Sequence, residues 1–183
     1  MNRAFVFIDG SNFYFKIKDL LSQTTRTCKF DFRDFAEWLV KPNQLIEIRY
    51  YLGAITRERG NIKSEKLYAN QQRLLANIQN QNIIIKLGQV IRHPDHTYHE
   101  KGVDVRLAVE MIRFAREDKY DIAYLISSDT DLVAAIEEVG AFNKVVQYVG
   151  FPKGQSFGLS KAADDVRLLR AEDIERFLPK SPP

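Results

Sequence analysis

Four aspartates stand where their carboxylates could gather at one site. Asp9 directly follows an apolar run, and Asp129 and Asp131 follow another. Asp104 stands at the start of a segment with helical periodicity. Carboxylate oxygens are the ligands that hard divalent ions prefer, so these residues point to a site for Mg²⁺ or Mn²⁺.

Aspartates that crowd together repel one another, which raises their pKa values unless a cation neutralises them. A bound metal removes that cost, activates a water molecule and stabilises charge on a phosphodiester. The structural alternative is that each aspartate forms a turn or caps a helix. Asp129 and Asp131 begin a predicted helix, so either could be its N-cap. Asp104, in the first turn of another helix, could merely interact favourably with the helix dipole. Asp9 fits this alternative least, because it follows a fully apolar strand.

Short apolar runs alternate along the chain with longer segments of helical periodicity. The apolar runs predict strands at residues 4–8, 45–55, 83–91, 122–126 and 145–149. The periodic segments predict helices at residues 31–40, 62–80, 104–117, 132–139 and 171–177. Residues 93–101 and 150–161 are predicted as loops. This alternation indicates one α/β domain with a mainly parallel sheet and right-handed crossovers.

The sheet must bring the aspartates to one edge. Ligands of open α/β sheets bind at the carboxyl ends of the strands, which is where Asp9, Asp129 and Asp131 are predicted. For Asp104 we expect a conflict. If its helix leads directly into the strand at 122–126, the first helical turn is expected at the opposite edge. Asp104 then reaches the site only if the preceding segment wraps around to the correct end.

The composition is that of a globular domain with a core of its own, at 183 residues, 45% hydrophobic and 28% charged. A formal net charge of +3 identifies no nucleic-acid-binding protein without a local basic patch. The single cysteine, Cys28, excludes an internal disulfide and suits a reducing compartment. No apolar run has the length of a membrane span, and no signal peptide is recognised, so we expect a cytoplasmic protein.

Three blocks of sequence carry a resemblance to a known family. They occur in family order along the chain and read Phe-Val-Phe-Ile-Asp-Gly-Ser-Asn at 5–12, Lys-Gly-Val-Asp-Val-Arg-Leu at 101–107 and Ser-Ser-Asp-Thr-Asp-Leu at 127–132. A weaker block comprises Ser156, Leu159 and residues 162–164. The chain resembles an NYN domain of the bacterial LabA-like type, in the PIN-like nuclease superfamily. The resemblance covers residues 1–178 as one domain and leaves 179–183 as a flexible tail.

The resemblance implies a PIN-like three-layer α/β/α sandwich around a central, mainly parallel sheet. It also implies that Asp9, Asp104, Asp129 and Asp131 are both the metal ligands and the catalytic residues. Glu110 replaces a frequent aspartate of the family and is expected to reach the same site.

Three polar residues are implied in substrate binding or orientation. Asn12 would orient a carboxylate or the phosphate, and Ser11 adjoins it in the same block. Ser128 stands where glycine is common and would bond a phosphate oxygen or its neighbour. The implied function is a metal-dependent ribonuclease that cleaves single-stranded or structured RNA with Mg²⁺ or Mn²⁺. The alternative is a catalytically inactive NYN module that binds RNA or a protein partner for regulation. A homodimer is compatible with the sequence.

Other classes fit less well. A haloacid-dehalogenase-like phosphatase also has an apolar strand that ends in Asp-Gly-Ser, but it needs a nucleophilic aspartate where Phe7 stands. A dinucleotide-binding domain needs further glycines after Gly10, and a P-loop needs its lysine motif; neither is present.

Some neighbouring residues have two interpretations. His93, His96 and His99 could bind a transition metal, but a polar loop is the favoured interpretation, since zinc sites draw ligands from several segments. Core packing is favoured for Phe13, Tyr14 and Phe15, and stacking of one ring on a base is the alternative.

Overall fold

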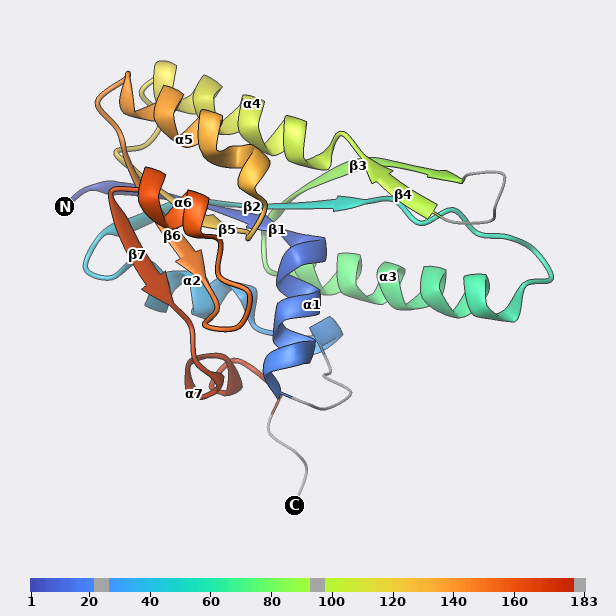
Figure 1. Cartoon of the computed structure of the whole chain (residues 1–183). Helices are drawn as coiled ribbons and strands as arrows, with labels where there is room; N and C mark the ends of the chain where they lie inside the picture. The colour runs from blue at the N-terminus through green and yellow to red at the C-terminus, as the bar shows by residue number, and fades with distance from the viewer. Residues whose placement is uncertain (22–26, 93–97, 180–183) are drawn as a thin grey trace.

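The computed structural model describes residues 1–21, 27–92 and 98–179. The described strands form one seven-stranded sheet in the order β4-β3-β2-β1-β5-β6-β7 (Figure 1). Their bounds are β1 Arg3–Asp9, β2 Gln44–Gly53, β3 Ile84–Arg92, β4 Tyr98–Lys101, β5 Ile122–Ile126, β6 Val145–Gly150 and β7 Asp165–Leu168. Six strands are parallel, and β4 alone pairs antiparallel, with β3. The predicted α/β class and mainly parallel sheet are confirmed.

Helices cover both faces of the sheet, so the domain has three layers (Figure 1). One face carries α1 Gly10–Leu21, α2 Phe32–Val40, α3 Ile62–Asn80 and α7 Ala171–Glu175. The other face carries α4 Val103–Arg116, α5 Val133–Gly140 and α6 Phe157–Ala162. Each face has its own hydrophobic core, and the two cores share only the sheet between them. The predicted α/β/α sandwich is therefore confirmed.

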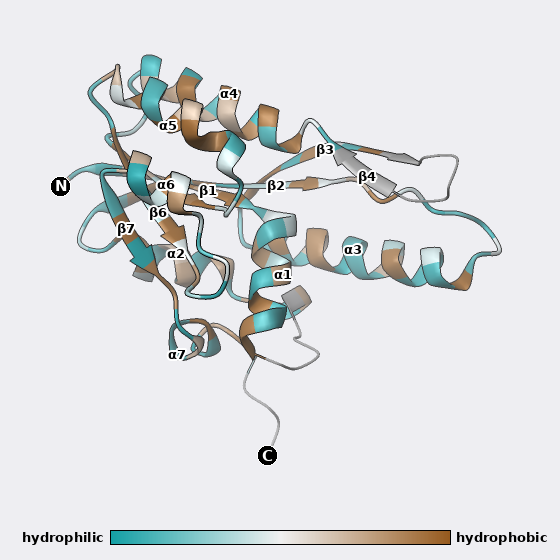
Figure 2. Ribbon diagram, viewed as in Figure 1, coloured by the Kyte–Doolittle hydropathy of each residue, from teal (hydrophilic) through white to brown (hydrophobic). Residues whose placement is uncertain are grey.

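The sequence pattern accounts for this layering. The central strand β1 is buried on both faces, with no side chain from Ala4 to Ile8 more than 4% exposed. A strand covered on both sides needs a continuous apolar run, which is what the sequence has here. The helices instead alternate hydrophobic and hydrophilic residues (Figure 2). In α4, Val103, Leu107 and Met111 recur every four residues and pack on the sheet.

Four of the described strands and α-helices lie where no strand or helix was predicted. The segment after Asp9 continues directly into α1. The predicted loop at 93–101 contains β4, and the predicted loop at 150–161 contains most of α6. The fourth is β7, whose side chains are mostly exposed because it lies at the edge of the sheet. These elements have weak apolar patterns of their own, and pairing or packing with neighbours forms them. Residues 180–183 of the predicted tail lie outside the described residues.

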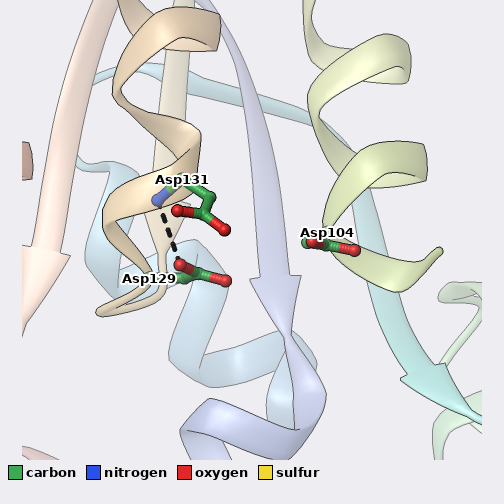
Figure 3. A group of neighbouring side chains, drawn as sticks. All are labelled: Asp104, Asp129 and Asp131. Atoms are coloured by element: carbon green, nitrogen blue, oxygen red, sulfur yellow. Dashed lines mark hydrogen bonds between the residues drawn. The ribbon is translucent and has the colours of Figure 1, made fainter. Parts of the chain in front are cut away.

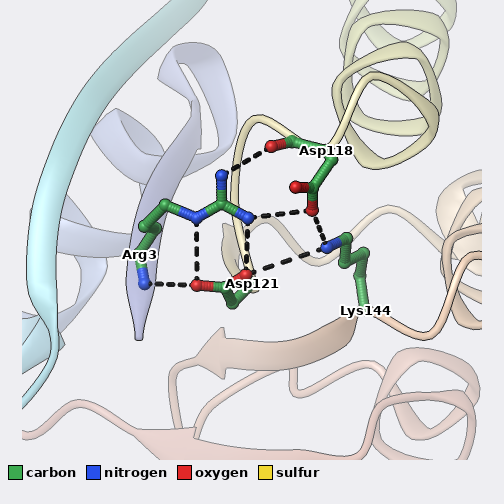
Figure 4. A network of polar contacts seen from close by, with 4 residues as sticks. All are labelled: Arg3, Asp118, Asp121 and Lys144. Carbon is green, nitrogen blue, oxygen red and sulfur yellow. Dashed lines mark hydrogen bonds and ion pairs between the residues drawn. The ribbon is translucent and has the colours of Figure 1, made fainter. Parts of the chain in front are cut away.

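An ion-pair network lies at the amino edge of the sheet, where β1 and β5 begin (Figure 4). Arg3 binds Asp121 through its guanidinium at 2.7 Å and through its backbone N–H at 2.7 Å. The same guanidinium binds the Asp118 carboxylate at 2.8 Å, and Lys144 also pairs with Asp118. Hydrogen bonds from Lys144 and Arg3 lower the pKa of Asp118, and those from Arg3 lower the pKa of Asp121. Each of these carboxylates is thus neutralised by the protein itself.

Among the described helices, none combines the length and the apolar character that a membrane span requires.

Candidate functional site

Three carboxylates converge at the carboxyl edge of the sheet. Asp104, Asp129 and Asp131 each offer one carboxylate oxygen, and these three oxygens lie within 4.8 Å of one another. Asp104 comes from α4, and the other two come from the segment between β5 and α5 (Figure 3). Asp131 is exposed, and the other two are half-buried. The structure therefore brings together three of the four predicted metal ligands.

Local hydrogen bonds shape the segment that carries Asp129 and Asp131. This segment leaves β5 and enters the short 3-10 helix η2, Thr130–Leu132. The Asp129 carboxylate caps η2 by accepting a hydrogen bond from the backbone N–H of Asp131 at 3.0 Å. The expected capping role of Asp129 is thus observed, and its carboxylate still belongs to the converging group. The structural and the functional interpretation of this aspartate are compatible.

The expected placement of Asp104 at the opposite edge is wrong. Helix α4 leads into β5 and runs antiparallel to it, so the end of α4 lies where β5 begins and its first turn lies at the carboxyl edge. Helix α4 enters after Gly102, which has a left-handed backbone with φ of 78°. The start of α4 also packs directly on β3, because a Cβ on Gly88 would lie 2.3 Å from the Val103 side chain. The antiparallel strand β4 brings the chain back along β3 to Gly102, so α4 begins at the carboxyl edge and Asp104 reaches the group.

Asp9 lies beside this group but is not one of its three members. Its Oδ1 accepts a hydrogen bond from the backbone N–H of Asn12 at 3.0 Å. Its Oδ2 accepts one from the Ser127 hydroxyl at 3.0 Å, and that hydroxyl in turn accepts from the backbone N–H of Asp129 at 3.1 Å. Ser127 thus connects Asp9 to the Asp129 segment. The sequence motif contains Ser127, but only the fold shows its two bonds.

Gly10 explains why Asp9 is followed at once by a helix. A Cβ at this position would lie 2.2 Å from the ring of Tyr50 and 2.7 Å from the carbonyl oxygen of Tyr51. The Tyr50 hydroxyl also donates a hydrogen bond to the Gly10 carbonyl at 3.3 Å. The start of α1 therefore lies against β2, and only glycine leaves enough space for this contact.

The three residues implied in orientation lie around Asp9. The Ser128 hydroxyl donates a hydrogen bond to the Asn12 side-chain oxygen at 2.7 Å. This bond joins the first turn of α1 to the segment that carries Asp129. Ser11 lies in the same first turn and is half-buried. Asn12 and Ser128 thus bind each other, and Ser128 directly precedes Asp129 of the aspartate group.

The expectation that Glu110 reaches this site is wrong. Its carboxylate is 6% exposed and points to β2, where it binds the Arg49 guanidinium at 2.5 Å and the Tyr51 hydroxyl at 2.8 Å. Lys86 and Arg106 approach its other oxygen at 3.7 and 3.5 Å. Burial alone would raise the pKa of Glu110, but the Tyr51 hydrogen bond and the Arg49 charge together lower it. Glu110 therefore ties α4 to the sheet.

The aromatic residues after Asp9 divide between core and surface. Phe13 is buried in the core, as predicted. The prediction of core packing is wrong for Tyr14 and Phe15, which are 39% and 62% exposed. Their positions on α1 explain the difference, because only one side of this helix faces the sheet.

The histidine loop gives less information. His93 and His96 lie outside the described residues. His99 belongs to β4, where its backbone pairs with Ile91 of β3.

The chemistry of the aspartate group fits a hard divalent cation. In the part of the chain that the structure describes, no lysine or arginine forms an ion pair with Asp104, Asp129 or Asp131. Three carboxylates at this separation repel one another when all are ionised. Oxygen donors without sulfur or imidazole favour Mg²⁺ or Mn²⁺ over softer metals. The site therefore has the donors of a magnesium or manganese site and lacks a compensating charge from the described protein.

Comparison with known proteins agrees with this fold. A search of the curated proteins found no match. A crystal structure of a protein of unknown function from Vibrio parahaemolyticus is similar, with a TM-score of 0.70 and 18% sequence identity. The likeness covers 97% of this chain and 96% of that one, and it supports the fold alone. The model of the NYN domain matches residues 3–170, which is nearly the whole chain. The chain therefore belongs to the NYN domain family, a family of PIN-like nucleases.

Proposed function

We propose that this protein is a metal-dependent ribonuclease that hydrolyses RNA phosphodiester bonds. One observation carries the proposal: carboxylate oxygens of Asp104, Asp129 and Asp131 lie within 4.8 Å of one another at the carboxyl edge of the sheet. Carboxylates from two separate segments meet there without a lysine or arginine partner among the described residues. Membership of the NYN family makes a phosphodiester the expected substrate.

In this proposal the aspartates have two roles, metal binding and the orientation of neighbouring groups. Asp104, Asp129 and Asp131 hold Mg²⁺ or Mn²⁺ through their oxygens. When bound, the metal supplies a water of lowered pKa and stabilises negative charge on the phosphate. Asp9 orients Ser127 and the start of α1 through its two acceptor oxygens, and it is a further candidate ligand.

The orienting residues complete this proposed site. We assign the orientation of the phosphate to the Asn12 amide and the Ser128 hydroxyl, and their hydrogen bond to each other supports this assignment. Ser11, in the same first turn of α1, is the third candidate for this role.

The direct test is cleavage of a labelled RNA by purified protein, with Mg²⁺, with Mn²⁺ and with EDTA. We expect cleavage with either metal and none with EDTA. Asp129→Asn is expected to abolish most of it, because an amide is a poorer ligand and carries no charge. Asp118→Asn, at the opposite edge of the sheet, serves as the matched control and should cleave normally. Cleavage that persists unchanged in EDTA or in Asp129→Asn rejects the proposed site.

A second candidate is a catalytically inactive NYN module that binds RNA or a protein partner. The position of Asp9 favours it, because both of its oxygens accept hydrogen bonds from the protein and it lies outside the three-carboxylate group. This candidate predicts RNA binding without turnover and no metal binding at millimolar Mg²⁺ or Mn²⁺. Calorimetric titration with each ion separates the two candidates.

Three finer expectations accompany the proposal. RNA, single-stranded or structured, is the expected partner, and the cytoplasm is the expected compartment. A homodimer is the oligomeric state to test, and sedimentation equilibrium of the purified chain would measure it.

A further inference from the structure

The exposed aromatic residues are gathered in two helices next to the aspartates. Among the described residues, the large aromatic side chains with substantial exposure are Tyr14 at 39%, Phe15 at 62% and Phe157 at 83%. Tyr14 and Phe15 lie in α1, which follows Asp9, and Phe157 begins α6. The chain has 21 aromatic residues, and the others whose burial the structure describes are buried or half-buried, so the three exposed rings lie in only two helices. Such placement is unusual for side chains that gain most from burial.

On α1, Phe15 shares a side of the helix with two residues that contact the site region. Residues three and four apart are neighbours on a helix, so Asn12, Phe15 and Lys16 lie along one side. Asn12 binds Ser128, and the Lys16 ammonium binds the carbonyl oxygens of Lys153 and Gly154 at 3.2 and 2.9 Å. Asn12 and Lys16 thus tie this part of α1 to the segments that follow β5 and β6, and Phe15, next to them on the helix, remains open to solvent.

On the other side, α6 packs on the segment between the aspartates. A Cβ at Gly158 would lie 3.4 Å from Thr130, the residue between Asp129 and Asp131. The Ser156 hydroxyl caps the start of α6 by accepting from the Leu159 N–H at 3.3 Å, which orders the first turn. Phe157 is in that turn, next to Gly158, and it is 83% exposed. Both aromatic-bearing helices thus contact the stretch from Ser128 to Asp131.

The two segments that carry these rings are themselves positively charged. Residues 10–21 and 151–163 carry four lysines and a single carboxylate, Asp19. Lys153 is paired with that carboxylate at 3.7 Å, which leaves Lys18 and Lys161 exposed beside the aromatic residues. Positive charge with interspersed aromatic rings is the combination that binds single-stranded nucleic acid.

We propose that Phe15 and Phe157 are stacking platforms for unpaired bases, so that the substrate of this site is single-stranded RNA. The inference rests on the proposed function, because it assumes that the phosphodiester lies at the aspartate group between the two helices. In a duplex the base faces are already stacked on one another and are not available to the phenylalanine rings. In a single strand each base offers a face, whatever its sequence. The two rings thus favour single-stranded over double-stranded RNA and do not discriminate among the bases.

The test is fluorescence anisotropy in EDTA, with a labelled ten-nucleotide oligouridylate and a blunt RNA duplex as probes. Wild type should bind the single strand at least tenfold more tightly than the duplex. Phe15→Leu and Phe157→Leu should each weaken single-strand binding by roughly fivefold or more, the loss of one stacked base. Phe157→Trp, which keeps a ring, should bind as wild type does. Ile62→Ala is the matched control, because Ile62 is equally exposed at 83% but begins α3.

The outcomes distinguish a failure of the stacking proposal from a failure of the proposed hydrolysis. Unchanged single-strand binding in both leucine variants, equal binding of the duplex, or no binding by wild type overturns the stacking platforms. If the leucine variants nevertheless cleave RNA with Mn²⁺ at wild-type rates, the proposed hydrolysis survives that failure. If the leucine variants lose binding and wild type never cleaves RNA, the stacking platforms stand and the proposed hydrolysis fails. Circular dichroism of both variants excludes misfolding as the cause of any loss.

Discussion

Carboxylates gather at both edges of the sheet, but the two clusters differ in whether the protein supplies positive charges to neutralise them. At the amino edge, Asp118 and Asp121 are bound by Arg3 and Lys144 (Figure 4). At the carboxyl edge, Asp104, Asp129 and Asp131 converge without an ion-pair partner among the residues that the structure describes (Figure 3). The first cluster holds the ends of the elements together. The second has no such partner from the described protein, and this is the cluster for which we propose an external cation.

This difference shows that the number of acidic residues in a cluster says little about its role. The balance of charge around them is what distinguishes structure from function. A cluster neutralised by its own chain gains stability and has little affinity left for a metal. A cluster without internal neutralisation costs stability until a cation binds, and that cost favours binding. The following predictions test this contrast, from the largest expected effect to the smallest.

The sharpest contrast should be in catalysis. Asp104→Asn, Asp129→Asn or Asp131→Asn is expected to slow RNA cleavage about 1,000-fold, because each removes charge worth several kcal/mol in the transition state. Asp121→Asn at the amino edge should cleave at the wild-type rate. Initial rates with saturating Mn²⁺ measure the effect. Equal rates for the variants of the two edges would remove the distinction between the clusters.

A third kind of carboxylate, Glu110, lies buried between α4 and the sheet and is neutralised there by Arg49. Glu110→Ala would leave Arg49 buried without its partner, and breaking such a pair costs about 3 kcal/mol. For a chain of this size we expect a melting temperature lowered by roughly 6–12 °C. Glu110→Gln, which can still accept from Tyr51, should lose less. Thermal denaturation followed by circular dichroism is the measurement, and an unchanged melting temperature in Glu110→Ala would contradict the assigned role.

Metal should raise the stability of the protein through the aspartates of the carboxyl edge and not through those of the amino edge. An ion present at about 100 times its dissociation constant adds about 2.7 kcal/mol to the free energy of unfolding. The melting temperature of wild type should therefore rise by roughly 5–10 °C with Mn²⁺. The rise should disappear in Asp104→Asn and persist in Asp121→Asn. A rise of equal size in Asp104→Asn would place the metal elsewhere.

The smallest expected effect concerns pH and the amino edge. The folded-state pKa of Asp121 is lowered by its bonds to Arg3, so its stabilisation is fully present above the unfolded pKa. It is lost as the pH falls below about 4, where the unfolded carboxyl takes up its proton. We expect Asp121→Asn to melt roughly 2–4 °C lower than wild type at pH 7, as for one exposed ion pair. The gap should narrow when the melting curves are repeated toward pH 3, and a constant gap would contradict the ionic explanation.

Local patterns determined how much of the fold could be predicted. The buried strand Ala4–Ile8 and the periodic helix α4 are strong signals, and their types were predicted correctly. The helix after Asp9 was missed because Gly10 and Asn12 also suit a turn. Only the close contact of Gly10 with Tyr50 shows that the chain turns at once into α1. Edge elements such as β7 depend on neighbours that are far away in sequence, so a local pattern cannot reveal them.

The candidate site was predictable in its residues and not in its geometry. Strand ends identified Asp9, Asp129 and Asp131; the last two belong to the converging group, and Asp9 does not. The expected edge for Asp104 was wrong, because a helix that leads into β5 runs antiparallel to that strand and has its first turn at the carboxyl edge. Glu110 has the residue type of a ligand, but its direction is set by Arg49 and Tyr51, which are about 60 positions away. Side-chain direction is a property of packing, and the sequence pattern does not contain it.

The close contact at Gly10 has a consequence for comparing relatives of this chain. Any side chain there would collide with the Tyr50 ring and the Tyr51 carbonyl, so either β2 or the start of α1, directly after Asp9, would have to shift. A relative could therefore keep every aspartate and still have lost their arrangement through one added methyl group. A survey that counts acidic residues would classify such a relative as intact. Position 10 is thus a marker by which degenerate family members can be separated from complete ones, without reference to any acidic residue.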